Sequence, residues 1–207
     1  MTVVTTSILF RGPMAARLPA ARRRRQILDT ALRVFGELGY HQASMDTIAE
    51  AAGVTKPVLY QHFESKHDLY LNLLGDVGAQ LVEAVVKATA GAGHPREQVE
   101  SGFRAYFRFV DAHVNAFRLL FGGGLEPDPE FAAVAAHVEE TMADSIAVLI
   151  EADLDPEHRR LLANGLVGLA EGTSRDWVKR ELELDPDRMA ARVAELAWAG
   201  LRGVHSD

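Results

Sequence analysis

The stretch SMDTIAEAAGVTKPVLYQHF, from Ser44 to Phe63, decides the fold of this chain. Apolar residues recur at helical spacing in its first half, and Gly53 then breaks the helix. A second short helix begins near Pro57 and buries Leu59 and Phe63. Small, glycine and apolar residues at these offsets suit two short helices that cross at a tight turn. The second helix of such a pair enters the major groove of DNA, so the pattern predicts a DNA-binding domain.

A longer region, from Arg22 to Leu74, resembles the TetR family of bacterial one-component transcription factors. The matching stretches are RRQILDTALRVFGELGYHQASMDTIAEAAGV and TKPVLYQHFESKHDLYLNLL. The later segments FRLLF, GLVGLAEGTSRDW and AWAGL are similar to actinobacterial members associated with lipid metabolism. The resemblance implies a ligand-responsive regulator, most often a repressor, that binds a palindromic operator as a homodimer.

Composition favours an all-α chain with about nine helices. The 207 residues are 48% hydrophobic and 25% charged, which allows a sizeable core. There is no cysteine, which excludes disulfides, thiolate metal sites and a cysteine nucleophile. We expect a disordered leader over residues 1–18, a DNA-binding domain over 19–66, and an effector-binding and dimerisation domain over 67–207.

Charge divides the chain unevenly. Residues 1–66 carry nine Lys or Arg and five Asp or Glu, whereas residues 67–207 carry thirteen and twenty-four. A net charge of +4 in the first segment and −11 in the second gives the total of −7. A basic N-terminal third on an acidic body indicates that only this third meets a polyanion.

Breaks in the pattern set the expected helix ends. Gly39 ends the first helix, and Ser44 and Ser65 are natural N-caps for the second and fourth. Glycine and proline clusters at 91–95, 122–129 and 153–156 separate the later helices. The expected helices cover about 20–38, 45–52, a short third helix from about 57, 66–90, 96–113, 117–121, 130–152, 157–181 and 187–204.

Several polar residues are candidates for DNA contact, although plain solvation is the alternative for each. Four arginines open the first helix, next to its positive end, where a phosphate partner would offset their repulsion. On the recognition helix, Gln61 can read adenine, and Lys56 can read guanine or bind phosphate. Family members often carry glycine where this chain has Pro57, whose ring could contact a thymine methyl. The full set is Arg22, Arg23, Arg24, Arg25, Ser44, Thr55, Lys56, Pro57, Tyr60, Gln61, His62 and Lys66.

Aromatic residues gather in the middle of the chain, and most of them must be core. The resemblance implies that some of them line a ligand cavity. The candidate wall residues are Leu81, Phe103, Phe107, Phe121, Val134, Val138, Leu162, Leu166 and Leu169. None is Lys or Arg, which favours an apolar effector such as a fatty acid or acyl-CoA. Arg118 or Arg175 could meet its polar head.

The last helix carries an apolar stripe that is wider than one neighbouring helix would cover. Together with one face of the preceding helix, it predicts a four-helix dimer interface about a two-fold axis. The candidate residues are Leu169, Thr173, Trp177, Met189, Val193, Leu196, Ala197, Gly200, Leu201 and Val204. The alternative is that the stripe packs against the chain's own ligand domain.

Two other classes of protein compete with a regulator. An enzyme is disfavoured because the chain has no HExxH, HxxEH or GxSxG motif, and Gly122–Gly124 do not follow a strand. Asp153, Asp155 and Glu157 fit an exposed loop better than a metal site. A ligand-free nucleoid or adaptor protein would not need the long acidic domain. We therefore expect no cofactor, no metal, no membrane span and a cytoplasmic location.

Overall fold

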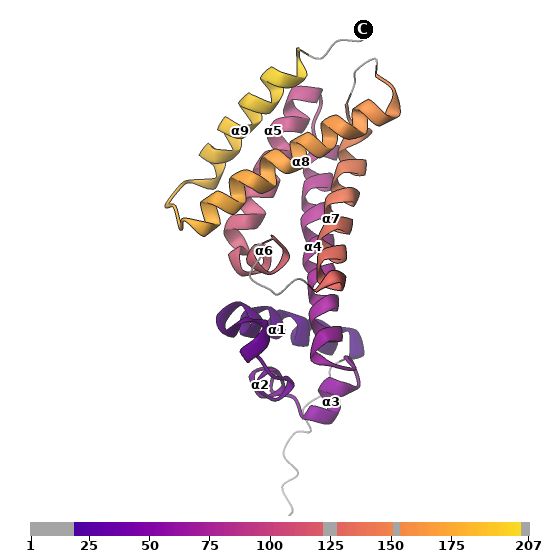
Figure 1. The fold of residues 1–207 in the computed structure, drawn as a ribbon, viewed down its shortest axis with the longest axis vertical. Coiled ribbons are helices and arrows are strands. Elements are labelled where there is room, and N and C mark those ends of the chain that lie inside the picture. Colours follow the sequence, from indigo (N-terminus) through magenta and orange to yellow (C-terminus); the bar gives the residue numbers. More distant parts are fainter. Residues whose placement is uncertain (1–18, 122–127, 151–153, 204–207) are drawn as a thin grey trace, which may run out of the picture.

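A computed structural model describes residues 19–121, 128–150 and 154–203. These residues form nine α-helices and no strand, as expected (Figure 1). The helices are α1 (Ala20–Gln42), α2 (Met45–Ala51), α3 (Lys56–Tyr60), α4 (Lys66–Ala90), α5 (Pro95–Ala112), α6 (Val114–Phe121), α7 (Pro129–Ala147), α8 (Pro156–Lys179) and α9 (Pro186–Leu201).

The first three helices form a small unit at one end of the molecule (Figure 1). Gly39 interrupts α1 with a φ of 76°, a value that glycine adopts without strain, so the regular helix ends where the sequence predicted. Gly53 makes the turn between α2 and α3 with a φ of 62°. The Ser44 hydroxyl accepts the Thr47 N–H and so caps α2. Apolar residues between these helices, including the fully buried Ile48 and Leu59, make the predicted small core.

Helix α4 joins this unit to the rest of the chain (Figure 1). Ser65 caps it by accepting the N–H of Asp68, as expected. Its length and composition would allow a membrane span, but 44% of the apolar window is buried inside the protein. Leu69, Leu73 and Leu81 lie in the core, against the DNA-binding unit below and against α5 and α7 above. The composition of α4 is therefore that of a core helix.

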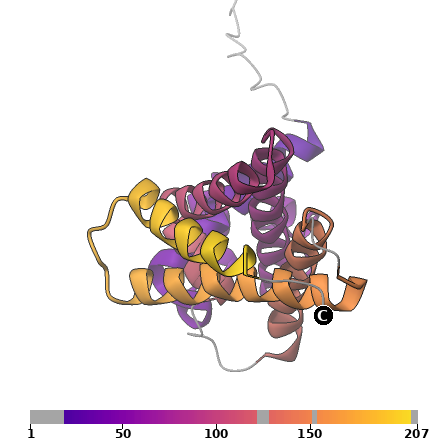
Figure 2. The ribbon, with the colours of Figure 1, turned by 90° about the horizontal axis from the view of Figure 1, so that it is seen from above.

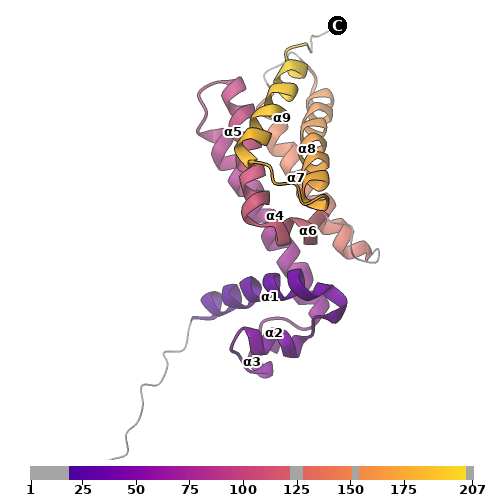
Figure 3. The ribbon, with the colours of Figure 1, turned by 90° about the vertical axis from the view of Figure 1, so that its left-hand side faces the viewer.

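The five remaining helices surround the upper part of α4. Helices α5 and α7 pack directly against α4, while α9 packs on α5 and α8 on α7. Seen from above, α8 and α9 lie together along one side of the bundle (Figure 2), and the side view places them opposite α4 (Figure 3). Phe107 and Trp177, 6.3 Å apart between ring centroids, join α5 to α8 in the core.

Helix α7 ends at Ala147, about five residues earlier than predicted. Beyond it, the N–H groups of Leu149 and Ile150 bond three residues back, to Ile146 and Ala147. Such bonds tighten the last turn and close the helix. Helix α6 begins at Val114, three residues earlier than expected. The proposed leader at 1–18, most of the 122–129 break and Val204 lie outside the described residues.

The contact between α4 and α7 is close enough to test by one substitution. A Cβ atom added at Gly78 would lie 2.2 Å from Val138 Cγ2. Gly78→Ala should therefore force the two helices apart and destabilise the protein by about 1–3 kcal/mol, measured by urea denaturation.

Gly75 provides the matched control, because it lies in the same helix and an added Cβ would meet nothing within 4 Å. Gly75→Ala should stabilise the protein by about 0.4–1 kcal/mol, since alanine restricts the unfolded chain. Equal effects of the two substitutions would contradict the close α4–α7 contact.

Candidate DNA-binding face and internal cavity

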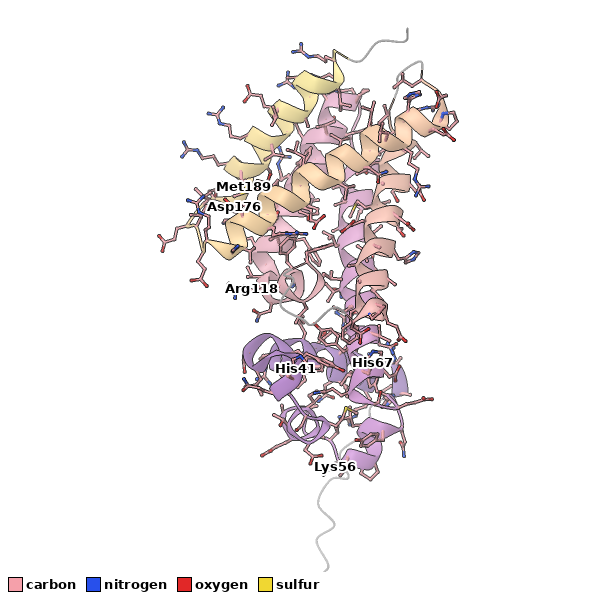
Figure 4. All side chains as sticks on the ribbon, viewed as in Figure 1. His41, Lys56, His67, Arg118, Asp176 and Met189 are labelled. Carbon is pink, nitrogen blue, oxygen red and sulfur yellow. The ribbon has the colours of Figure 1, made fainter. Side chains whose placement is uncertain are left out.

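Helix α3 presents a polar surface at the lower end of the molecule, where Figure 4 labels Lys56. Thr55, Lys56, Pro57, Tyr60 and Gln61 are all exposed, and half of Tyr60 is accessible to solvent. Pro57 lies in the first turn, where its missing N–H breaks no helical bond. The five exposed residues share one surface that can reach a groove, while the sixth candidate, His62, is partly buried.

Two candidates near this face, Lys56 and Ser44, have partners within the protein. Lys56 Nζ lies 2.6 Å from Asp46 Oδ2 in an exposed ion pair, which is weak and can be exchanged for phosphate. The Ser44 hydroxyl bonds the N–H and hydroxyl of Thr47, so its first role is to cap α2.

The DNA contact predicted for Lys66 stays a prediction, and in the structure its ammonium group has partners inside the domain. Its Nζ donates to the carbonyl oxygens of Tyr40 at 2.8 Å and Ala43 at 3.0 Å, and it lies 3.4 Å from that of His41. It also lies 4.5 Å from the centroid of the Tyr40 ring. These contacts engage the ammonium group inside the domain. Lys66 therefore joins the start of α4 to the end of α1.

Some of the four arginines at the start of α1 also have hydrogen-bond or ion-pair partners within the protein. Arg24 Nη2 bonds Asn72 Oδ1 at 2.6 Å, and Arg25 pairs with Asp76 at 2.9 Å, so both tie α1 to α4. Arg23 bonds Gln26 within its own helix. Arg22 is exposed and makes no side-chain contact within the described ranges. All four arginines stay predicted DNA contacts, and Arg22 is the one that has no competing hydrogen bond or ion pair within the described ranges.

A cavity with a volume of about 520 Å³ lies in the half of the bundle far from α3. Three of the predicted wall residues, Phe103, Leu162 and Leu166, line it. The other lining residues are Val85, Thr89, Pro95, Gln98, Val99, Gly102, Tyr106, Met142, Ile146, Leu149, Ile150, Val167, Ala170, Trp198, Leu201 and Arg202. A mostly apolar space of this size is typical of a small-molecule site.

The other six predicted wall residues do not line this cavity. Leu81, Phe121 and Val138 surround a separate void of about 10 Å³, which shares Tyr106, Met142 and Val167 with the cavity. Phe107 is fully buried in the core against Trp177. Val134 and Leu169 are partly buried and pack against the core. Apolar periodicity identified which face of each helix points inward. It could not show at which position along the bundle the inward faces leave a cavity between them.

The cationic residues of the cavity are also different from those expected. Arg118 pairs with Glu181, and Arg175 pairs with Glu171, and neither lines the cavity. Arg202, at the C-terminal end of α9, does line it. The cavity therefore has a cationic residue that the predicted set of wall residues did not include. The sequence signal was weak, because Arg202 lies at the end of the apolar stripe of α9.

Polar groups gather at the end of the cavity nearest the second void. Tyr106 lines both spaces, and its buried hydroxyl lies beside Ser174. Burial raises the pKa of Tyr106 above its ordinary value, and Glu171 and Glu139 add to this, while nearby Ser174 lowers it. Burial also raises the pKa of Glu139, with further contributions from the charge and hydrogen bond of Glu171.

The described residues among the predicted dimer set differ in how far the chain itself buries them. Trp177, Val193 and Ala197 are buried within the chain, and Trp177 Nε1 donates to the carbonyl of Leu182, so they belong to the core. Leu201 lines the cavity, and Leu169, Thr173 and Met189 are partly buried. Leu196 and Gly200 are exposed. The alternative, that the apolar stripe of α9 packs against the chain's own ligand domain, thus holds for the buried half of the stripe, which covers α5.

The outer face of α8 carries small side chains and is exposed. Leu161 is 66% exposed, and Gly165, Gly168 and Gly172 follow it at helical spacing. A Cβ atom added at any of these glycines would meet nothing within 4 Å. Leu196 on α9, 63% exposed, adds a second large apolar side chain to the surface formed by these two helices.

An aromatic cluster connects the two parts of the molecule near His67, at the base of α7 (Figure 4). The Phe131 ring stacks on His67 at 4.8 Å and lies edge-on or tilted to Tyr40 at 5.3 Å and Tyr70 at 4.7 Å, measured between centroids. His67 Nε2 lies 3.1 Å from Asp128 Oδ2, and the same carboxylate caps α7. The start of α7 is thereby held on the DNA-binding unit.

Metal chemistry finds no support in the part of the chain that the structure describes. No group of three His, Asp or Glu residues there is arranged to hold an ion. Asp155 uses its carboxylate to cap α8, accepting the N–H groups of Glu157 and His158. Asp153 lies outside the described ranges.

Comparisons with known proteins agree with this architecture. Residues 27–73 match the family described as bacterial regulatory proteins, tetR family, and residues 95–200 match the tetracyclin repressor-like C-terminal domain. The chain is 36% identical over 190 residues to the HTH-type transcriptional activator FasR of Mycolicibacterium smegmatis, covering 91% of this chain and 87% of that protein.

Solved structures show the same fold. A TetR-like transcriptional regulator from Rhodococcus sp. RHA1 superposes with a TM-score of 0.73 at 31% identity, covering 91% of this chain and 100% of that one. The regulator FadR from Bacillus subtilis superposes with a TM-score of 0.72 at 20% identity, covering 87% and 99%. The chain belongs to the TetR family and is a DNA-binding transcriptional regulator rather than an enzyme.

Proposed function

We propose that this regulator binds a palindromic operator as a homodimer and that an elongated apolar molecule, such as a fatty acid or acyl-CoA, controls this binding from the internal cavity. The observation that carries the proposal is the 520 Å³ cavity, whose wall is mainly aliphatic and aromatic. It lies far from α3, so a ligand there must act on DNA binding through the helices between them. Such action requires only that the ligand prefer one arrangement of the domains.

The cavity has features that suit an amphipathic ligand. Gln98 and Arg202 line one part of it, where they can meet an anionic or polar head group. Tyr106 lies two helical turns further along α5, on the order of 12 Å from Gln98 along the helix axis. Between them the wall is apolar. FadR from Bacillus subtilis, which shares this fold, was crystallised in complex with stearoyl-CoA, and that compound is a suitable first probe.

The sign of regulation depends on where the operator lies. The resemblance favours a repressor, whereas the relative from Mycolicibacterium smegmatis is named a transcriptional activator. Release from DNA would end repression at an operator that overlaps a promoter, and would end activation at an operator upstream of it. The proposed mechanism is the same in both cases, and it places the protein in the cytoplasm with its DNA.

The arginine run makes a testable division between DNA contact and domain packing. Arg22 is exposed and makes no side-chain contact to another described residue, so it is available for a phosphate. Arg22→Ala should flatten the slope of log K against log salt by about one unit. Fluorescence anisotropy with a labelled operator over a range of salt concentrations measures this slope.

Arg25 is the matched control, because its guanidinium is paired with Asp29 and Asp76. Arg25→Ala should leave the salt slope unchanged and lower thermal stability slightly, since exposed ion pairs contribute little. A flatter slope for Arg25→Ala alone would show that the contact assignments are reversed.

The cavity predicts a thermal response to ligand. Stearoyl-CoA at a hundredfold excess over its Kd should raise the melting temperature by about 5–10 °C, because it binds only the folded state. Leu166→Trp should fill part of the cavity and reduce this shift while operator binding without ligand persists. Val86→Trp, at an exposed position of α4, should respond like the wild type. Scanning fluorimetry makes the comparison, and identical shifts for all three proteins would exclude the cavity as the site.

The exposed face of α8 and α9 supports the homodimer. Glycines at 165, 168 and 172 allow another helix to approach α8 closely, and Leu161 and Leu196 offer apolar area to it. Isolated apolar residues are common on surfaces, but two large ones beside a glycine face fit a packed interface. A two-fold axis through this face would match the symmetry of a palindromic site.

Leu196→Glu tests the dimer without disturbing the fold, because this side chain is already 63% exposed in the single chain. A carboxylate buried without a partner at an interface should weaken dimerisation by roughly 3 kcal/mol, about a hundredfold. Light scattering should report monomers, with helical circular dichroism preserved and tight operator binding lost. Val86→Glu, on the opposite side of the bundle, should remain dimeric. A dimeric Leu196→Glu protein would place the interface elsewhere.

A further inference from the structure

The cavity ends partway along the bundle, and a small void continues in the same direction. On α4, Thr89 and Val85 line the cavity, while Leu81, one turn nearer the DNA-binding unit, lines the void of about 10 Å³. On α7, the lining of the cavity ends at Met142, and that of the void extends to Val138. The two spaces therefore follow one another along the same helix faces, and side chains close the passage between them.

Three side chains form this closure. Tyr106 of α5, Met142 of α7 and Val167 of α8 line both spaces, and we call them the partition. Tyr106 is 5% exposed and Met142 is 3% exposed, and Val167 packs against the core. The partition is therefore an internal wall that three different helices build.

The partition lies where the end of an apolar chain would arrive. Gln98 and Arg202 line the part of the cavity that suits a polar head group, so the chain of such a ligand points toward the partition. Beyond it, the void is only about large enough for one water molecule. Glu139 and Glu171 supply part of the wall of the void, which suits an apolar chain poorly. A chain therefore gains affinity from each methylene that it buries in the cavity, but not from growth past the partition.

We propose that Met142 and Val167, together with the Tyr106 ring, determine the longest acyl chain that the cavity can bury. This inference rests on the proposed apolar effector and adds the property by which the protein selects among such molecules. Met142 is the most informative position, because a methionine side chain is unbranched and fills irregular gaps in a core. Its truncation opens the passage without adding an atom that could clash.

The test measures Kd by isothermal titration calorimetry for saturated acyl-CoAs that lengthen by two carbons at a time, from decanoyl-CoA to arachidoyl-CoA. For the wild type, affinity should rise roughly tenfold per step, because each buried methylene contributes about fourfold, and should stop rising at the chain length that reaches the partition.

Met142→Ala removes Cγ, Sδ and Cε and joins the void to the cavity, so the rise should continue for at least one further step. Val167→Ala should shift the limit in the same direction. It is a smaller truncation at a less buried position, so it decides the question if Met142→Ala does not fold.

Ile146→Ala is the matched control. Ile146 lies one turn from Met142 on α7 and lines the cavity but not the void. Ile146→Ala should weaken the binding of every chain by a similar factor and leave the limiting length unchanged.

Three results would overturn the inference and leave the apolar effector standing. They are a wild-type affinity that rises through arachidoyl-CoA, a limit that stays in place in the folded partition variants, and a limit that Ile146→Ala shifts equally. Failure of every acyl-CoA to bind the wild type would overturn the proposed effector class as well.

Discussion

The structure depends on α4 being one continuous helix that both halves of the molecule share. Its lower turns are fixed to the DNA-binding unit through Lys66, Asn72 and Asp76, which meet the end and the start of α1. Its upper turns supply Val85 and Thr89 to the cavity wall. Twenty-five residues at 1.5 Å each give a rod on the order of 37 Å long. In the proposed mechanism, a ligand in the cavity acts on the DNA-binding unit along this rod.

A second connection runs through α7. Its first turn places Phe131 against His67, Tyr40 and Tyr70, while its last turns place Met142 and Ile146 in the cavity wall. Gly78 allows α7 to approach α4 closely between these two ends. Two of the five helices that line the cavity, α4 and α7, thus both reach the DNA-binding unit. Packed helices with few alternative arrangements can convert a small change in their separation into a domain movement.

Charge shows how composition and structure answer different questions. The excess of Lys and Arg in the first third correctly indicated which part of the chain meets a polyanion. Yet Arg24, Arg25 and Lys66 are engaged within the domain, where they attach α1 to α4. The charges of Arg24 and Lys66 still add to the positive field, because their hydrogen-bond partners are uncharged. The charge of Arg25 is offset by Asp29 and Asp76. The excess of Lys and Arg does not by itself show which of these side chains contact DNA directly.

The sequence by itself determined the helices and the turn that defines the DNA-binding unit. Ser44 and Ser65 as caps, and the glycine turns at 39 and 53, lie where they were predicted. These features depend on interactions within about four residues, so the local sequence contains the information. The same holds for the family resemblance, whose motif is one continuous stretch.

Only the tertiary structure decided what each apolar helix face meets. Trp177 and Val193 were expected at a dimer interface and lie in the core, while Leu201 and Arg202 line the cavity. Periodicity could not separate these cases, because an apolar stripe is the same whether it covers a neighbouring helix, an open cavity or a second chain. The cavity is likewise a property of the whole bundle, because α4, α5, α7, α8 and α9 all supply residues to its wall.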